Sequence, residues 1–174
     1  GSEMCIRDSN NKKSAINFFE IACKQYLEIN DTFSYSSSLL NLGYAQFSSG
    51  DSIHGIINLK KSIKHLEKFN KYYDMILAYL SITEYYLDMK NFNEFNRYIN
   101  LATETAKRID DKESLARCYF ASALGCVVQL DYNGAINYAT KARNTFNQNN
   151  LSIDSVLSIA YEGIAVSYTH LTLP

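Results

Sequence analysis

The chain has 174 residues, of which 17 are Lys or Arg and 18 are Asp or Glu, so its formal net charge is −1. This balance provides neither a basic surface for nucleic acid nor an acidic tail. Hydrophobic residues make up 47% of the chain and charged residues 20%, which argues against disorder. One Pro and 7 Gly supply too few turn signals for a β-sandwich or a β-barrel. Composition therefore favours an all-α fold.

Related residues recur along the chain at an interval of 40 positions. One register contains Ala15, Gly55, Phe95 and Ala135, followed seven residues later by Ala22, Ser62, Ala102 and Ala142. A second register contains Gly43, Thr83, Ala123 and Gly163. Small residues where helices cross let the helix axes approach, and seven residues correspond to two helical turns. The pattern predicts antiparallel helix pairs that stack on their neighbours.

Apolar periodicity and short polar connectors predict about eight helices. Their expected ranges are 11–29, 33–48, 52–68, 73–89, 92–108, 112–129, 132–147 and 153–168. Residues 11–168 are expected to form one repeat domain. Residues 1–10 are expected to be a non-native or irregular segment, and residues 169–174 an irregular tail.

These residues resemble the tetratricopeptide repeat family. The matching positions are Leu39, Leu42-Gly43, Phe47, Gly50-Asp51, Ile56 and Ser62, and again residues 131–136 with Ala142. The family's usual period is about 34 residues, so an interval of 40 implies longer helices. The resemblance implies an all-α fold, a right-handed α-α superhelix or solenoid of antiparallel helix pairs. The sequence departs from the family at Gly55 and Phe95, where Ala is usual, and it lacks the helix-ending Pro.

The third helix pair has an irregular spacing. Leu124-Gly125 stands two residues too close to Ala135 for the family pattern. Either Ala123 takes the packing position or this pair contains a deletion. Ala123 keeps the 40-residue register, so we expect it to pack at the crossing.

The two ends of the chain do not follow the repeat. Gly1-Ser2 resembles a scar of tag removal, and residues 4–9 and 166–174 resemble translated sequencing linker. We therefore expect an interior piece of a longer protein. The alternative is a pair of degenerate caps, since terminal repeats are often atypical.

The sequence offers no catalytic constellation. The three His residues, His54, His65 and His170, have no evident nucleophile or metal-ligand spacing, and no Gly-rich phosphate loop occurs. Glu84 and Asp88 are four residues apart and either flank a ligand or belong to a solvated helix face, which we favour. We therefore expect no enzymatic activity, cofactor or metal.

Four Cys without a C-x-x-C pair favour reduced thiols and a cytoplasmic location. The sequence contains no run of eighteen apolar residues, so we expect no membrane span.

In the resembling family, the first helix of each pair lines a concave groove. Carrying those positions over gives a mixed apolar and polar groove: Ser37, Leu40, Asn41, Tyr44 and Phe47, then Leu80, Ser81, Glu84 and Asp88, then Arg117, Phe120 and Leu124, and finally Tyr161. This set contains no Lys/Arg cluster, which disfavours a clamp for a partner's terminal carboxylate.

The leading functional hypothesis is a non-catalytic scaffold that binds a protein or peptide in this groove. The alternative is a sensor or regulatory domain of a larger bacterial regulator, such as a kinase, a transcription factor or a peptide-pheromone receptor. Neither nucleic acid nor a membrane is an expected partner. Apolar stripes on the terminal helices predict self-association, and we favour a homodimer through a terminal helix face.

Overall fold

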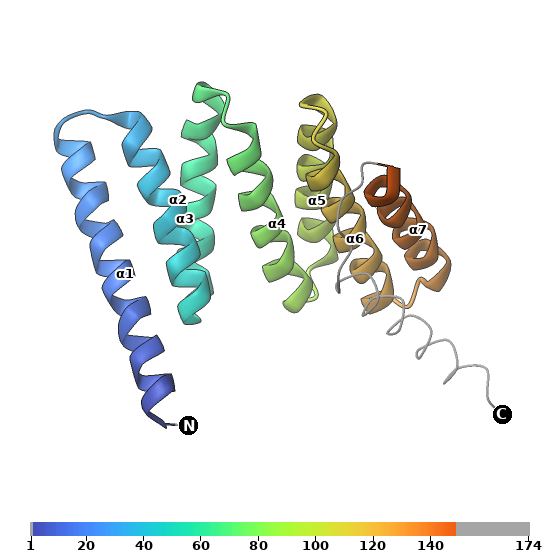
Figure 1. Cartoon of the computed structure of the whole chain (residues 1–174), viewed down its shortest axis with the longest axis horizontal. Coiled ribbons are helices and arrows are strands. Elements are labelled where there is room, and N and C mark those ends of the chain that lie inside the picture. The colour runs from blue at the N-terminus through green and yellow to red at the C-terminus, as the bar shows by residue number, and fades with distance from the viewer. Residues whose placement is uncertain (1, 149–174) are drawn as a thin grey trace. The chain divides into compact units, whose positions relative to one another are not determined.

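The computed structural model describes residues 2–148, with side chains described for residues 11–146 (Figure 1). This part of the chain is all-α, with consecutive helices joined by short connectors. Its elements are α1 (Ser2–Glu28), α2 (Thr32–Ser49), α3 (Ser52–Leu66), the 3-10 helix η1 (Glu67–Phe69), α4 (Tyr72–Asp88), α5 (Phe92–Arg108), α6 (Lys112–Val128) and α7 (Tyr132–Gln148). The helices predicted between residues 33 and 147 are confirmed, with ends that differ by a residue or two. The predicted helix at 153–168, the tail at 169–174 and Tyr161 lie outside the described residues.

The start of α1 differs from the sequence-based expectation. Residues 1–10 were expected to be a non-native or irregular segment, and α1 begins at Ser2 and runs through residues 2–10 without a break. Each residue added to an existing helix gains a backbone hydrogen bond, whereas a separate short helix is marginal without a packing partner. Extension of α1 is therefore the favoured local structure.

The connectors between helices repeat every 20 residues. Each contains one residue in the left-handed backbone region: Asn30, Gly50, Asn70, Lys90, Asp110 and Leu130. The backbone N–H of the following residue reaches back to the carbonyl five positions earlier, as from Asp31 to Tyr26 and from Asp131 to Cys126, both at 2.9 Å. This is the Schellman motif, which satisfies carbonyl groups that a helix end leaves without partners.

The residue after each left-handed position often begins the next helix. Asp31, Asp51, Asn91, Asp111 and Asp131 each accept a hydrogen bond from the backbone N–H three residues further on. One helix therefore ends and the next is capped within two residues. So short a connector reverses the chain and makes consecutive helices antiparallel neighbours.

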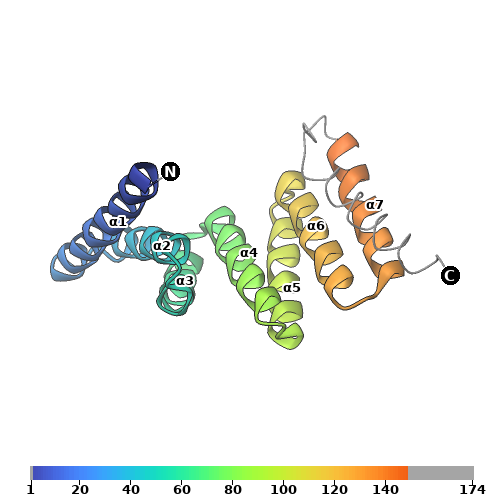
Figure 2. The ribbon, with the colours of Figure 1, turned by 90° about the horizontal axis from the view of Figure 1, so that it is seen from below.

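The described part of the chain divides into two compact units, one that ends at Ala78 and one that begins at Tyr79, so the boundary lies inside α4. In the first unit α2 contacts both α1 and α3 (Figures 1 and 2). Its core against α1 contains Cys23, Leu39 and Leu42, with Ile16 and Phe19 packed alongside. These apolar side chains recur at helical spacing, so burial of one face of each helix stabilises the pair.

In the second unit α6 contacts both α5 and α7. Ala123 is buried against Ala135 and Ala139, which confirms that Ala123 takes the packing position. Gly125 has a separate role, because a Cβ at this position would overlap the ring of Phe95 on α5. The large Phe95 thus replaces the usual small residue by packing onto a glycine. This arrangement accounts for the irregular spacing of Leu124-Gly125.

None of the helices within residues 2–148 combines the length and the apolar character needed to cross a bilayer.

Candidate partner-binding surface

In the first unit the predicted groove residues lie on α2. Ser37, Asn41 and Tyr44 share one side of the helix, because intervals of three and four residues return to the same face. Asn41 is exposed, whereas Ser37 and Tyr44 are partly buried. Leu40, expected in the groove, is instead a buried core residue. The α2 surface is therefore more polar than predicted.

The ring of Tyr44 is partly exposed, whereas its hydroxyl is buried. The hydroxyl oxygen is buried and makes no hydrogen bond within the described part of the chain. Burial raises the pKa of Tyr44 far above its usual value, and the negative charges of Asp74 and of an ionised Tyr73 raise it further. A buried donor without an acceptor costs free energy. Tyr44 is consequently both a surface residue and a local weakness of the fold.

Phe47 lies where α2 crosses α3 and is partly exposed. A Cβ at Gly55 would stand only 3.0 Å from the backbone nitrogen of Phe47, so the two backbones are in close contact there. The position of Phe47 is therefore fixed by the helix crossing. Its ring belongs to the helix crossing and is also partly exposed at the predicted groove.

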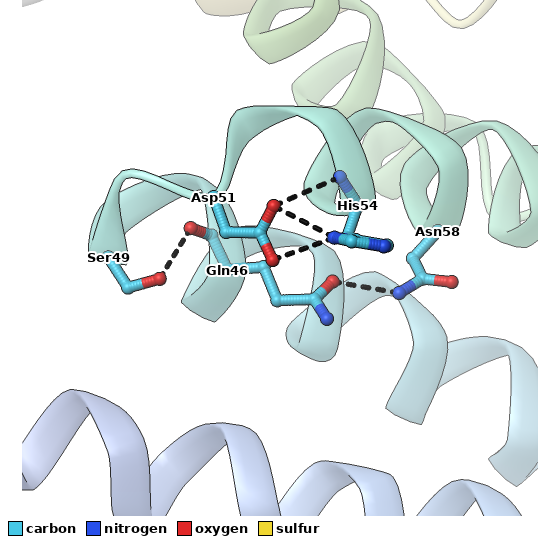
Figure 3. Close-up of polar contacts among 5 residues, drawn as sticks. All are labelled: Gln46, Ser49, Asp51, His54 and Asn58. Carbon is cyan, nitrogen blue, oxygen red and sulfur yellow. Dashed lines mark hydrogen bonds and ion pairs between the residues drawn. The ribbon is translucent and has the colours of Figure 1, made fainter.

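A polar cluster next to Phe47 joins the end of α2 to α3 (Figure 3). Asn58 Nδ2 donates to Gln46 Oε1 at 2.8 Å, and Ser49 Oγ donates to the Gln46 carbonyl oxygen at 2.7 Å. The Asp51 carboxylate accepts from the His54 backbone N–H and lies 2.9 Å from His54 Nδ1. Asp51 is the N-cap of α3, so the cluster holds the start of that helix in place.

In the second unit α4 contributes Leu80, Ser81, Glu84 and Asp88. Leu80 and Ser81 are partly buried, whereas both carboxylates are exposed. Tyrosine stacking on another side of α4 fixes its orientation: the rings of Tyr86 and Tyr98 lie 5.7 Å apart and nearly parallel. The stack packs α4 against α5.

The α6 surface is the most apolar part of the predicted groove. Phe120 is partly exposed, and Leu124 and Val128 follow at intervals of four residues with 37% and 42% of their surface exposed. Arg117 stands one turn before Phe120 and pairs with Glu113, with Arg117 Nη2 at 2.5 Å from Glu113 Oε1. We call Arg117, Phe120, Leu124 and Val128 the α6 surface.

The described thiols are free and buried to different degrees. Cys23 and Cys118 are buried and Cys126 is partly buried. Burial raises the pKa of Cys118 to about 12, although a hydrogen bond with Thr103 acts in the opposite direction. A thiol held in its protonated form is a poor nucleophile and a poor metal ligand. Within residues 11–146, no three His, Cys, Asp or Glu side chains gather as metal ligands.

Met89 and Leu130 are two of the exposed apolar residues that the sequence interpretation did not single out. Met89 and Leu130 both lie at connectors between helices, and both are largely exposed. Leu130 is itself the connector residue with left-handed backbone geometry, and Met89 comes just before the equivalent residue, Lys90. The 20-residue connector period was the signal that identifies these positions. Their exposure follows from helix termination.

Neither a family model nor a curated protein sequence matches the chain. The helix pairs, their register and the exposed faces are therefore the basis on which its function is inferred.

Proposed function

We propose that this protein is a non-catalytic, cytoplasmic scaffold of the tetratricopeptide type that binds a peptide or a helix of a protein partner. The surface best suited to this role is the α6 surface. The observation that supports it is the pair Leu124 and Val128, two apolar side chains exposed one helical turn apart. Apolar residues that gather on one face of a surface helix are typical of binding sites.

The partner's chemistry follows from these side chains. Phe120, Leu124 and Val128 form an apolar strip whose period matches a helix or an extended peptide with regularly spaced apolar anchors. Arg117 and Glu113 neutralise each other at one end of that strip. An uncharged apolar anchor is therefore the expected ligand group. On α4, the exposed Glu84 and Asp88 favour a basic residue in whatever binds that helix.

The test begins with peptides selected from a random library against the immobilised full chain. Fluorescence anisotropy then gives the affinity of one selected peptide for wild type and for Leu124→Asp. We expect Leu124→Asp to weaken binding by at least about tenfold, because a charge would replace an apolar contact. The matched control is Leu101→Asp on α5, since Leu101 has a similar exposure of 40% but lies on the second helix of its pair.

The two variants separate the proposal from its alternatives. An unchanged affinity in Leu124→Asp, or an equal loss in Leu101→Asp, would show that peptide recognition does not use the α6 surface. Thermal unfolding of both variants checks that an affinity change is not a loss of fold. Because both side chains are exposed, we expect the two melting temperatures to remain close to that of wild type.

A further inference from the structure

A row of lysines lies along the outer side of α3 and η1. Five of the 17 Lys and Arg residues of the chain fall within residues 60–71, where Glu67 is the only acidic residue. Lys61, Lys64 and Lys68 are exposed and stand three and four residues apart, so they share one side of the helix. A chain with a net charge of −1 thus carries a locally basic surface.

These lysines lack acidic partners. Within residues 11–146, Lys61, Lys64 and Lys68 take part in no ion pair. On α5, the corresponding helix of the next pair, charges are paired instead, as Lys107 Nζ is with Glu104 Oε1 at 2.9 Å. Lysines four residues apart on a helix repel each other, so carboxylates placed between them would remove an unfavourable interaction.

The negative end of the α3 dipole accounts for only part of this row. Lys64 lies in the last turn of α3, where a positive charge is favourable. That effect falls off within one turn, and Lys61 lies before the last turn. A negatively charged partner explains the whole row.

Two isoleucines extend the row toward the start of α3. Ile53 and Ile57 precede Lys61 at intervals of four residues, so they lie on the same side of the helix, with 65% and 44% of their surface exposed. We call Ile53, Ile57, Lys61, Lys64 and Lys68 the α3 face. Its apolar part comes first along the helix and its basic part follows. The equivalent side of α5, an interior helix, is exposed too, so this side is a surface of the fold.

A polypeptide fits the α3 face better than a nucleic acid or a membrane does. A phosphate backbone is charged along its whole length, whereas only half of the α3 face is basic. A helix that lies on a membrane carries apolar residues along its whole length, with basic residues on its other side. On the α3 face the apolar and basic residues instead follow one another along the axis. The complementary ligand is a segment whose acidic and apolar residues are separated in the same way.

We propose that the α3 face binds an acidic helix of a partner protein that lies antiparallel to α3. Carboxylates of the partner lie opposite the three lysines, and its apolar side chains lie opposite the two isoleucines. The N-terminus of an antiparallel helix lies beside the end of α3, so its acidic residues fall in its first turns, where its own dipole favours them.

The size of the partner follows from the length of the α3 face. The 15 residues of α3 span about 22 Å, so a helix of about the same length covers the face. This surface is separate from the α6 surface, and the inference does not depend on the function proposed there.

Fluorescence anisotropy of the full chain with two synthetic peptides tests the proposal. One peptide has Glu in its first two helical turns and Leu in the next two, at intervals of three and four residues. The other has the same composition with Glu and Leu interleaved. We expect the first peptide to bind at least about tenfold more tightly at low salt. Its affinity should fall as the salt concentration rises, because exposed charges are screened.

Charge reversal on the α3 face separates local recognition from overall charge. The double variant Lys61→Glu/Lys68→Glu should weaken binding of the first peptide by at least about tenfold. The matched control is Lys13→Glu/Lys24→Glu on α1, which changes the net charge equally at two exposed lysines outside the α3 face. We expect the control to bind like wild type. Ile57→Asp should also weaken binding, because the apolar part of the ligand would then meet a charge.

Four results would overturn the proposal. They are the absence of binding by both peptides, equal affinity for the two peptides, an equal loss in the two double variants, and tighter binding of a DNA duplex or of anionic phospholipid vesicles than of the first peptide. Thermal unfolding of each variant checks that a lost affinity is not a lost fold. Because the substituted side chains are exposed, we expect melting temperatures close to that of wild type.

Discussion

Gly43 and Gly55 face each other where α2 crosses α3. A Cβ at Gly55 would lie 2.9 Å from the Gly43 carbonyl oxygen, and a Cβ at Gly43 would lie 3.1 Å from the Gly55 carbonyl oxygen. Both separations are shorter than ordinary van der Waals contact, so only glycine allows the two backbones to come this close. The two residues belong to the two 40-residue registers of the sequence. Their contact explains physically why both registers favour small residues.

Alanine substitution should affect these two glycines unequally. At Gly55 the new Cβ would meet backbone atoms, which cannot move aside, and overpacking of this kind costs about 1–3 kcal/mol. At Gly43 the closest atoms belong to the Leu59 side chain, with Cγ at 2.8 Å, and the nearest backbone atom is farther away, at 3.1 Å. Replacing a helical glycine by alanine also gains about 1 kcal/mol in helix propensity. We expect urea unfolding to show a clear loss for Gly55→Ala and a smaller one for Gly43→Ala. The reverse order would show that the crossing is not as close as described.

The same Ala→Leu substitution should have different effects at three equivalent positions of the repeat register. Ala102 and Ala142 are fully buried, so Ala102→Leu and Ala142→Leu should each cost about 1–3 kcal/mol through overpacking. Ala22 occupies the same register position on α1, where it is only partly buried. Ala22→Leu should therefore be tolerated when the free energy of unfolding is measured at low protein concentration. Three equal losses would show that Ala22 is packed as tightly as Ala102 and Ala142.

Leu130 adopts a backbone conformation that suits glycine better. Its φ is 62°, in the left-handed region, which costs an L-residue with a side chain about 1–2 kcal/mol. Its side chain is 70% exposed, so little burial would be lost on removing it. Leu130→Gly should raise the free energy of unfolding by up to about 1 kcal/mol, after the greater entropy of unfolded glycine is subtracted. The converse change, Gly50→Ala, should destabilise. Gly50 has a φ of 93°, which strains an alanine even though open space surrounds the position.

Tyr44→Phe should stabilise the protein. The substitution removes a buried hydroxyl that has no hydrogen-bond partner, and such a group costs about 1–3 kcal/mol. The ring and its packing are retained, so the substitution leaves no cavity. Differential scanning calorimetry at neutral pH measures the change in melting temperature. A lower melting temperature in Tyr44→Phe would show that the hydroxyl is satisfied in solution.

The sequence predicted the helices well because connector chemistry and apolar period agree. The Asp or Asn at 31, 51, 91, 111 and 131 caps a helix, and each follows a left-handed residue. These signals are local, so they need no knowledge of tertiary packing. The choice of Ala123 over a deletion also came from the register and is confirmed by its burial against Ala135.

The candidate site was harder to predict because exposure depends on packing partners. Leu40 has the spacing of a groove residue but is buried in the first unit. The missing partner of the Tyr44 hydroxyl likewise follows from which helix lies alongside. Residues 2–10 gave no repeat signal, and their continuation of α1 reflects the low cost of extending a helix. Propensity and periodicity do not encode these relationships.

Recognition of a partner by the α6 surface is the central claim, and methyl NMR tests it most directly. The full chain, labelled on Leu, Val and Ile methyl groups, would be titrated with a peptide selected from the library. The account predicts the largest chemical-shift changes at Leu124 and Val128, with Leu101 on α5 and Ile136 on α7 unaffected. Changes confined to Leu101 and Ile136, with Leu124 and Val128 unmoved, would contradict it.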